Sequence, residues 1–311
     1  MLICGLDGKI NVSLLLGGVI VENKATIGFI GTGVMGKSMA GHLQQAGHPL
    51  HVFTRTKHKA NSLIENGAVW EDSVASLAKN VDVIITIIGT PEDVKSVYFG
   101  ADGLIENAKK GSYLIDMTTS SPKLAEEIFE VSKENGLHAL DAPVSGGDIG
   151  AKEAKLAIMV GGNEQDFNNV LPIFQVMGGN IILQGSAGAG QHTKMVNQIA
   201  IAPLMIGLAE AIVYAQKSGL DPYKVLDSIS TGAAGSWSLT NYTPRILKDD
   251  FAPGFAIKHY IKDMKIAIES AEEMGLATPG LELALEMYEK LAENGEGESG
   301  IQALVKYFEL P

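Results

Sequence analysis

The sequence has 311 residues, of which 46% are apolar and 19% are charged. This length exceeds the usual size of one domain, and the composition supplies large apolar cores, so two folded domains are expected. The 36 acidic residues outnumber the 24 basic ones, and the formal net charge of −12 argues against binding of nucleic acid or of an anionic membrane surface. Cys4 is the single cysteine and cannot form an internal disulfide, which fits a reducing cytoplasm.

Residues 1–24 contain no motif and are interpreted as an N-terminal extension. Residues 25–188 alternate apolar strand patterns with helical ones, which predicts a Rossmann-like, doubly wound α/β sheet. Strands are expected at 27–30, 51–53, 81–88, 113–116, 138–141, 157–160 and 181–183. Helices between them are expected at 34–46, 60–66 and 124–135.

From residue 189 the strand patterns stop, and we expect an all-helical second domain over 189–311. Its helices are expected at 194–218, 222–230, 260–274 and 279–293. The first of these would be the long central helix that joins the two domains. Its apolar stretch is interrupted by Pro203 and Glu210, so we interpret it as a buried helix of a soluble protein without a membrane span. The apolar helical domain favours a homodimer or homotetramer.

A glycine-rich motif, Gly31-Thr32-Gly33-Val34-Met35-Gly36, directly follows the first predicted strand and opens the first helix. The first glycine of such a motif permits the tight turn, the second lets a pyrophosphate approach the backbone, and the third allows close packing of helix and strand. The amides of the helix N-terminus then face the anion. The complete context of strand, motif and helix predicts a dinucleotide-binding site.

The end of the second strand indicates which dinucleotide is bound. An NAD site normally places an acidic residue there, but no acid occurs from His51 to Lys59. Arg55 is suited to a 2′-phosphate, and the residues that would accompany it are Thr54, Thr56 and Lys59. We therefore predict NADP, with NAD less favoured; a solvated basic loop is the alternative interpretation.

Two segments suggest a site for a small carboxylate-bearing substrate. Ser145-Gly146-Gly147 follows a strand, and consecutive amides of this kind can form an anion-binding concavity, although any glycine turn has the same composition. Lys194 stands in the expected first turn of the long helix, where the helix dipole and burial would both lower its pKa toward the range of proton exchange. A lysine that extends to solvent is the alternative. Asn197 and Gln198, one turn later, could orient the lysine or the substrate.

Five separated motifs together are similar to the β-hydroxyacid dehydrogenase family, which includes 3-hydroxyisobutyrate dehydrogenase and several semialdehyde reductases. The motifs are GFIGTGVMG (28–36), DMTTSSP (116–122), DAPVSGG (141–147), GAGQHTKMVNQ (188–198) and FAIKHYIKDM (255–264). The resemblance covers the chain from Ala25 nearly to its end. It implies NADP-dependent transfer of a hydride between the cofactor and a small hydroxy acid or its semialdehyde, at a site between the two domains.

The resemblance also implies roles for single residues. Lys194 would be the general acid/base, with Asn197 or Gln198 hydrogen-bonded to the substrate. Residues that would hold the substrate or line its pocket are Ser145, Gly146, Gly147, Phe255 and Asp263. Beyond the motif at 31–36 and the basic loop, the residues that would contact the cofactor are Ile88, Gly89, Thr119 and Lys262. No metal ion is expected.

Some positions depart from the family pattern. Gly89 stands where proline is common, Ala154 replaces a frequent glycine, and Gln198 takes the place of a frequent asparagine. By sequence alone, Lys262 and Asp263 at a helix start resemble an ordinary surface salt bridge. An imine reductase-like enzyme is one alternative, but there the family lysine is typically replaced. A catalytically inactive NADP-binding sensor or scaffold is the other, and it would have no need of Lys194.

Overall fold

The computed structural model describes residues 12–16 and 19–310. They form two compact units, which divide between Lys194 and Met195, inside one continuous helix. Cys4 lies outside the described residues. Within the segment 1–24, β1 (Val12–Leu16) and β2 (Val19–Asn23) pair as antiparallel strands, which the sequence analysis did not predict.

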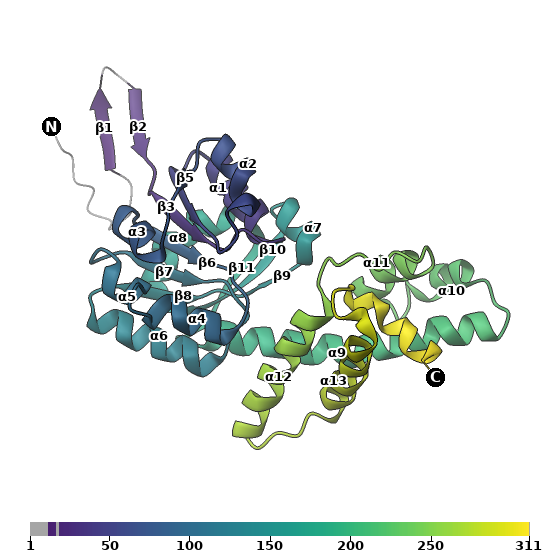
Figure 1. The fold of residues 1–311 in the computed structure, drawn as a ribbon. Helices are drawn as coiled ribbons and strands as arrows, with labels where there is room; N and C mark the ends of the chain where they lie inside the picture. The colour runs from purple at the N-terminus through teal and green to yellow at the C-terminus, as the bar shows by residue number, and fades with distance from the viewer. Residues whose placement is uncertain (1–11, 17–18, 311) are drawn as a thin grey trace. The chain divides into compact units, whose positions relative to one another are not determined.

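The first unit is built on a nine-stranded sheet with helices on both faces (Figure 1). Its strands are β3 (Ile27–Ile30), β4 (Leu50–Phe53), β5 (Val69–Trp70), β6 (Val83–Thr86), β7 (Tyr113–Asp116), β8 (His138–Asp141), β9 (Val144–Ser145), β10 (Leu156–Gly162) and β11 (Gly178–Gly185). They lie in the order β11-β10-β8-β7-β6-β3-β4-β5, and β9 pairs with β10. The strands from β8 to β5 are parallel to their neighbours, whereas β10 meets β8 antiparallel. The predicted Rossmann-like sheet is confirmed.

The strand order reverses at β3. The chain adds β4 and β5 on one side of β3, and then returns to add β6, β7 and β8 on the other side. Ligands of open α/β sheets bind beyond the carboxyl ends of the strands at such a reversal. The loops after β3 and β6 are therefore the positions where a cofactor is expected.

Side chains that alternate along each central strand supply a separate core on each face of the sheet. Phe29 and Ile85 belong to one core, whereas Ile30 and Ile84 belong to the other. The helices that supply buried residues to the first core are α1 (Gly36–Gln45), α2 (Asn61–Glu65), α7 (Gly147–Lys152) and α8 (Glu164–Gln175). Those of the second core are α3 (Val74–Asn80), α4 (Pro91–Phe99), α5 (Leu104–Asn107) and α6 (Pro122–Glu134). Both faces of the strands at 27–30 and 83–86 are therefore buried, and Thr86 is the one polar residue among them.

The second unit is all-helical, as predicted. Its helices are α9 (Ala189–Lys217, shared with the first unit), α10 (Pro222–Ile229), α11 (Trp237–Ile246), α12 (Ile257–Glu273), α13 (Pro279–Leu291) and a 3₁₀ helix at Ile301–Glu309. Its apolar core includes Tyr260 and Tyr288, whose rings meet edge to face with centroids 5.2 Å apart. Both α9 and α12 begin earlier than the sequence patterns indicated, at Ala189 and Ile257.

The early start of α9 corrects one prediction. Lys194 is the sixth residue of this helix and lies beyond its first turn, so the expected opposition between its charge and the helix dipole is weaker than predicted. Burial of the lysine is confirmed, because its side chain is 7% exposed.

One face of α9 carries exposed apolar residues. Leu204 is 37% exposed and Tyr214 is 73% exposed, and Ala200, Gly207 and Ala211 lie between or beside them at helical spacing. Among the described helices, α9 is the one that is long and apolar enough to cross a membrane. Only 39% of the most apolar 18-residue stretch of α9 is buried, so the prediction of a buried helix is wrong for the single chain.

Candidate active site

The glycines of the motif at 31–36 shape the loop between β3 and α1. Gly31 has a φ of +102°, and a Cβ atom there would overlap the carbonyl oxygen of Ile87. A Cβ atom at Gly36 would overlap the carbonyl oxygen of Gly31. The first and third glycines are therefore required for the turn and for the packing of α1, as predicted.

The middle of the same loop leaves room for a ligand. Apart from Gly33 itself and its two chain neighbours, no described residue has a heavy atom within 4 Å of the position that a Cβ atom would take at Gly33. Thr32 is 2% exposed, and its Oγ1 has no hydrogen-bond partner among the described residues. A buried hydroxyl without a partner is costly unless a ligand satisfies it. The loop thus fits the pyrophosphate of a dinucleotide, held at the N-terminus of α1.

Arg55 has an acidic partner that the sequence analysis missed. Its Nη1 lies 3.1 Å from Oδ1 of Asp93 in α4, and its side chain is 79% exposed. The other carboxylate oxygen of Asp93 accepts the backbone N–H of Thr90 in a capping box at the start of α4. A Cβ atom at Gly89 would overlap this carboxylate, so a larger residue at position 89 would require the Asp93 side chain to move. The sequence Thr90-Pro91-Glu92-Asp93 has the signature of a capping box, so the start of α4 could have been predicted from it.

The rest of the basic loop is not joined to this pair. Thr56 precedes a short 3₁₀ turn at Lys57–Ala60, and its carbonyl accepts the N–H of Lys59 at 3.0 Å. The side chain of Lys59 is exposed, and Lys57 lies over the ring of Trp70. Roles for Thr54, Thr56 and Lys59 toward a cofactor stay predictions.

The predicted substrate segment and the predicted acid/base lie next to each other. Gly146 and Gly147 have φ values of +129° and +61°, which turn the backbone sharply after β9. Lys194 Nζ donates to the carbonyl oxygen of Val144 at 2.9 Å, directly before Ser145. The buried ammonium group is thereby held against the segment predicted to bind a carboxylate.

Two buried carboxylates stand at the ends of neighbouring strands. Asp141, at the end of β8, accepts the backbone N–H groups of Gly188 at 2.9 Å and Gln191 at 2.8 Å. It therefore caps the start of α9, and burial raises its pKa. Asp116, at the end of β7, accepts from the hydroxyl of Thr86 at 2.8 Å and the N–H of Thr118 at 3.0 Å. Burial raises the pKa of the Asp116 carboxyl to about 6, against the opposing effect of these hydrogen bonds.

This raised pKa predicts a pH-dependent effect of Asp116→Asn. Between about pH 4 and 6 the folded protein retains a proton that the unfolded chain has lost, so Asp116 lowers the free energy of unfolding as pH rises. The loss reaches about 3 kcal/mol above pH 6. Asp116→Asn removes this titration, and urea unfolding at pH 4.5 and 7.5 should show the variant gaining stability relative to the wild type at the higher pH. An equal difference at both pH values would contradict the prediction.

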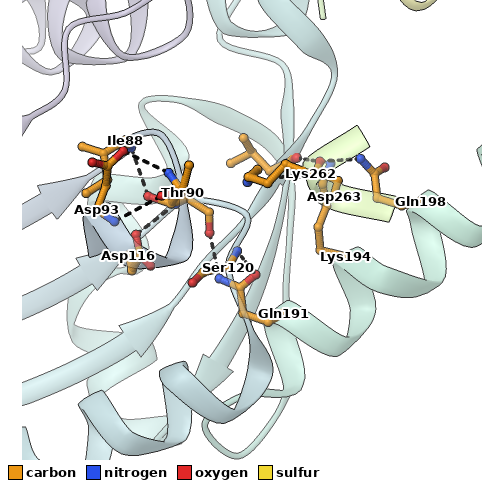
Figure 2. Close-up of polar contacts among 12 residues, drawn as sticks. Ile88, Thr90, Asp93, Asp116, Ser120, Gln191, Lys194, Gln198, Lys262 and Asp263 are labelled. Atoms are coloured by element: carbon orange, nitrogen blue, oxygen red, sulfur yellow. Dashed lines mark hydrogen bonds and ion pairs between the residues drawn. The ribbon is translucent and has the colours of Figure 1, made fainter. Parts of the chain in front are cut away.

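The predicted site residues of the second unit lie on α9 and α12, except Phe255, which precedes α12. Asn197 Nδ2 donates to Gln198 Oε1 at 2.7 Å, and Gln198 Nε2 donates to Asp263 Oδ2 at 2.6 Å. Lys262 Nζ lies 3.0 Å from Asp263 Oδ1, with side-chain exposures of 18% and 3% (Figure 2). Asp263 is buried and Lys262 is partly buried, so the interpretation as an ordinary surface salt bridge is wrong. Phe255 packs on Tyr260, with ring centroids 5.5 Å apart.

A buried network in the first unit was also missed. Thr118 Oγ1 accepts the N–H of Ile88 at 3.0 Å, and the amide group of Gln191 bonds the backbone on both sides of Thr119. Ser120 is 1% exposed, and its Oγ has no partner among the described residues. Among residues 12–16 and 19–310, no group of three or more His, Cys, Asp or Glu side chains could hold a metal ion.

Comparison with known proteins agrees with this architecture. Residues 26–185 match the NAD binding domain of 6-phosphogluconate dehydrogenase, and residues 188–308 match the NAD-binding domain of NADP-dependent 3-hydroxyisobutyrate dehydrogenase. An uncharacterized oxidoreductase of Bacillus subtilis is 62% identical, covering 91% of this chain and 98% of its own. The 2-hydroxy-3-oxopropionate reductase of Escherichia coli is 38% identical, covering 91% and 97%. The structure of Mycobacterium tuberculosis 3-hydroxyisobutyrate dehydrogenase with L-serine superposes with a TM-score of 0.84, at 32% identity over 92% of this chain and all of its own.

A Rossmann unit that carries a dinucleotide loop, followed by a helical unit, defines an NAD(P)-dependent oxidoreductase. The chain belongs to the β-hydroxyacid dehydrogenase family, and the resemblance found in its five motifs is confirmed.

Proposed function

We propose that the protein transfers a hydride between NADP(H) and a small hydroxy acid or its semialdehyde, with Lys194 as general acid/base. The observation that supports this most directly is the position of Lys194, which is 7% exposed and bonded to Val144 beside Ser145-Gly146-Gly147. A buried ammonium next to backbone amides that can hold a carboxylate suits a substrate with a carboxylate near its reacting carbon.

When bound, the cofactor supplies or accepts the hydride. The amides at Ser145, Gly146 and Gly147, with the hydroxyl of Ser145, hold the substrate carboxylate and fix the reacting carbon. Lys194 donates a proton to the oxygen of the carbonyl during reduction and removes it during oxidation. Its bond to the Val144 carbonyl keeps Nζ at one position before the substrate arrives.

Residues of the second unit extend the proposal. Gln198 or Asn197 hydrogen-bonds the substrate, Phe255 and Asp263 line or brace its pocket, and Lys262 contacts the cofactor. The chain of bonds from Asn197 through Gln198 to Asp263 supports these roles, because it fixes the orientation of these polar side chains.

Arg55 supports the preference for NADP, and Asp93 allows a matched test. Arg55→Ala is expected to weaken NADPH binding about tenfold and leave NADH nearly unchanged, because it removes the cation next to the 2′-phosphate. Asp93→Asn removes an opposing carboxylate 3.1 Å from the guanidinium and keeps an oxygen for the cap of α4, so NADPH binding should tighten several-fold. Fluorescence titrations with both cofactors measure this; equal losses for NADPH and NADH in Arg55→Ala would contradict it.

The direct test of function is a panel of substrates assayed with NADPH and with NADH. Glyoxylate, succinic semialdehyde and tartronate semialdehyde are assayed as substrates for reduction. 3-Hydroxyisobutyrate is an alcohol, so it is assayed for oxidation with NADP+ and with NAD+. Each of the four carries a carboxylate near the reacting carbon. We expect turnover of at least one of them with a higher kcat/KM for NADPH. A preference for NADH would overturn the cofactor assignment, and tight NADPH binding without turnover would favour a sensor or scaffold.

We also propose a cytoplasmic homodimer or homotetramer that binds neither nucleic acid nor membranes. The exposed apolar face of α9 supports the oligomer, since exposed apolar patches of soluble proteins commonly mark contact surfaces. Sedimentation velocity should give at least twice the chain mass of 32.9 kDa, and a monomer at micromolar concentration would overturn the assignment.

A further inference from the structure

Gln191 is a buried side chain to which the proposed mechanism gives no role. It is the third residue of α9, is 0% exposed, and uses both ends of its amide group. Its Nε2 donates to the carbonyl oxygen of Thr118 at 2.8 Å, and its Oε1 accepts the N–H of Ser120 at 2.9 Å (Figure 2 shows the contact with Ser120). The two contacts span more than 70 residues of sequence and clamp the backbone on both sides of Thr119.

The clamped loop is tied in turn to the loop after β6. The hydroxyl of Thr118 accepts the N–H of Ile88 at 3.0 Å, and the N–H of Thr118 donates to Asp116 at 3.0 Å. Both Thr118 and Ser120 are almost fully buried. A single amide group therefore connects the loops that carry Thr119 and Ile88 to the start of the helix that carries Lys194.

The main chain of Gln191 is fixed as firmly as its side chain. Its N–H donates to Asp141 at 2.8 Å, so β8 also holds the first turn of α9. Lys194 follows three residues later, less than one helical turn along α9. A shift of the Thr118–Ser120 loop relative to this turn would change the distance between Thr119 and Lys194.

We propose that Gln191 is a positioning residue, whose amide group holds the Thr118–Ser120 loop and the first turn of α9 in the one arrangement that hydride and proton transfer require. The inference rests on the proposed function of Lys194. Glutamine is suited to this position because it offers one donor and one acceptor at the same end of the side chain. An ionised glutamate offers acceptors alone and would repel the Thr118 carbonyl, whereas a protonated glutamate restores the donor.

This difference in protonation gives the test. In Gln191→Glu, kcat at pH 8 should fall at least tenfold relative to the wild type, with a smaller change in KM. The ratio of variant to wild-type kcat should recover as pH falls toward 6, because the new carboxyl group becomes protonated. Gln191→Met lacks donor and acceptor, so its kcat should be low at every pH. Gln44→Glu is the matched control. The Gln44 amide also donates to two carbonyl groups, those of Leu63 and Asn66, but it does not belong to this network. The kcat of Gln44→Glu should therefore stay near that of the wild type.

Hydrogen–deuterium exchange provides a readout that is independent of turnover. Peptides covering 117–121 should exchange faster in Gln191→Met than in the wild type. They should also exchange faster in Gln191→Glu than in the wild type when both proteins are measured at pH 8. Wild-type kcat and exchange in folded Gln191→Met, or a Gln191→Glu ratio that does not change with pH, would overturn the inference. Turnover that survives Lys194→Ala would instead remove the proposed role of the lysine and leave the exchange result standing.

Discussion

Lys194→Ala is expected to lower kcat/KM about 10³-fold while NADPH binding stays within a few-fold of the wild type. Positioned acid/base groups contribute about 10²- to 10⁴-fold to rate, and Lys194 is the buried amine held beside the proposed carboxylate site. Lys194→Arg separates charge from proton transfer, because a guanidinium stays protonated and cannot exchange a proton near neutral pH. It should be nearly as inactive as the alanine variant. Steady-state kinetics and NADPH fluorescence measure the two quantities.

Lys155→Ala is the control for this experiment. Lys155 is an exposed lysine of the same unit, paired with Glu153 at the surface, and its removal should leave both turnover and cofactor binding unchanged. If Lys194→Ala retains more than a tenth of wild-type kcat/KM, the lysine is not the acid/base. If NADPH binding is lost together with turnover, Lys194 supports the cofactor site and its assignment to proton transfer is wrong.

Gly33→Ala should abolish tight cofactor binding without destabilising the fold. Beyond its two chain neighbours, no described residue comes within 4 Å of the new methyl group, so the free energy of unfolding should change by less than about 0.5 kcal/mol. The methyl group occupies the space through which the pyrophosphate approaches the backbone, and the Kd for NADPH should rise at least tenfold. Calorimetric titration and urea unfolding of the same samples test both statements.

Two neighbouring glycines complete the comparison. Gly31→Ala places a methyl group against the carbonyl of Ile87 at a positive φ, so it should lose stability and cofactor binding together. Gly41→Ala lies within α1 and meets only Leu63, at 3.8 Å, so it should lose neither. Wild-type NADPH affinity in Gly33→Ala would show that the pyrophosphate does not contact this loop.

The sequence predicts those parts of the molecule whose causes are local. The turn at Gly31, the apolar strand before it and the basic residue Arg55 can each be recognised within a few residues, and the structure contains all three. The start of α9 was missed by five residues, because Gly188 and Gly190 suggest a loop. Its first turn is stabilised by Asp141, which lies 47 residues before Gly188 and gives no local sign of that role.

The same distinction applies to the site residues. The residue types at Lys194 and Ser145 could be recognised, but their proximity depends on the Val144 carbonyl 50 residues earlier in the chain. Lys262 and Asp263 suggested a surface pair because adjacent opposite charges are common on exposed helices. Asp263 is instead buried, and Gln198, 65 residues earlier in the chain, supplies a hydrogen bond that a buried carboxylate requires.

The two units share α9, and this limits how the chain can be divided. A fragment that ends at Lys194 keeps fewer than two turns of that helix, far below the length at which an isolated helix holds its shape in water. The backbone of Lys194 is then a frayed end, although its side chain is bonded to Val144 of the Rossmann unit. Recombination that exchanges the helical unit of one family member for another must therefore join the parts within the helix and preserve its phase, since each added or deleted residue turns the downstream face by about 100°.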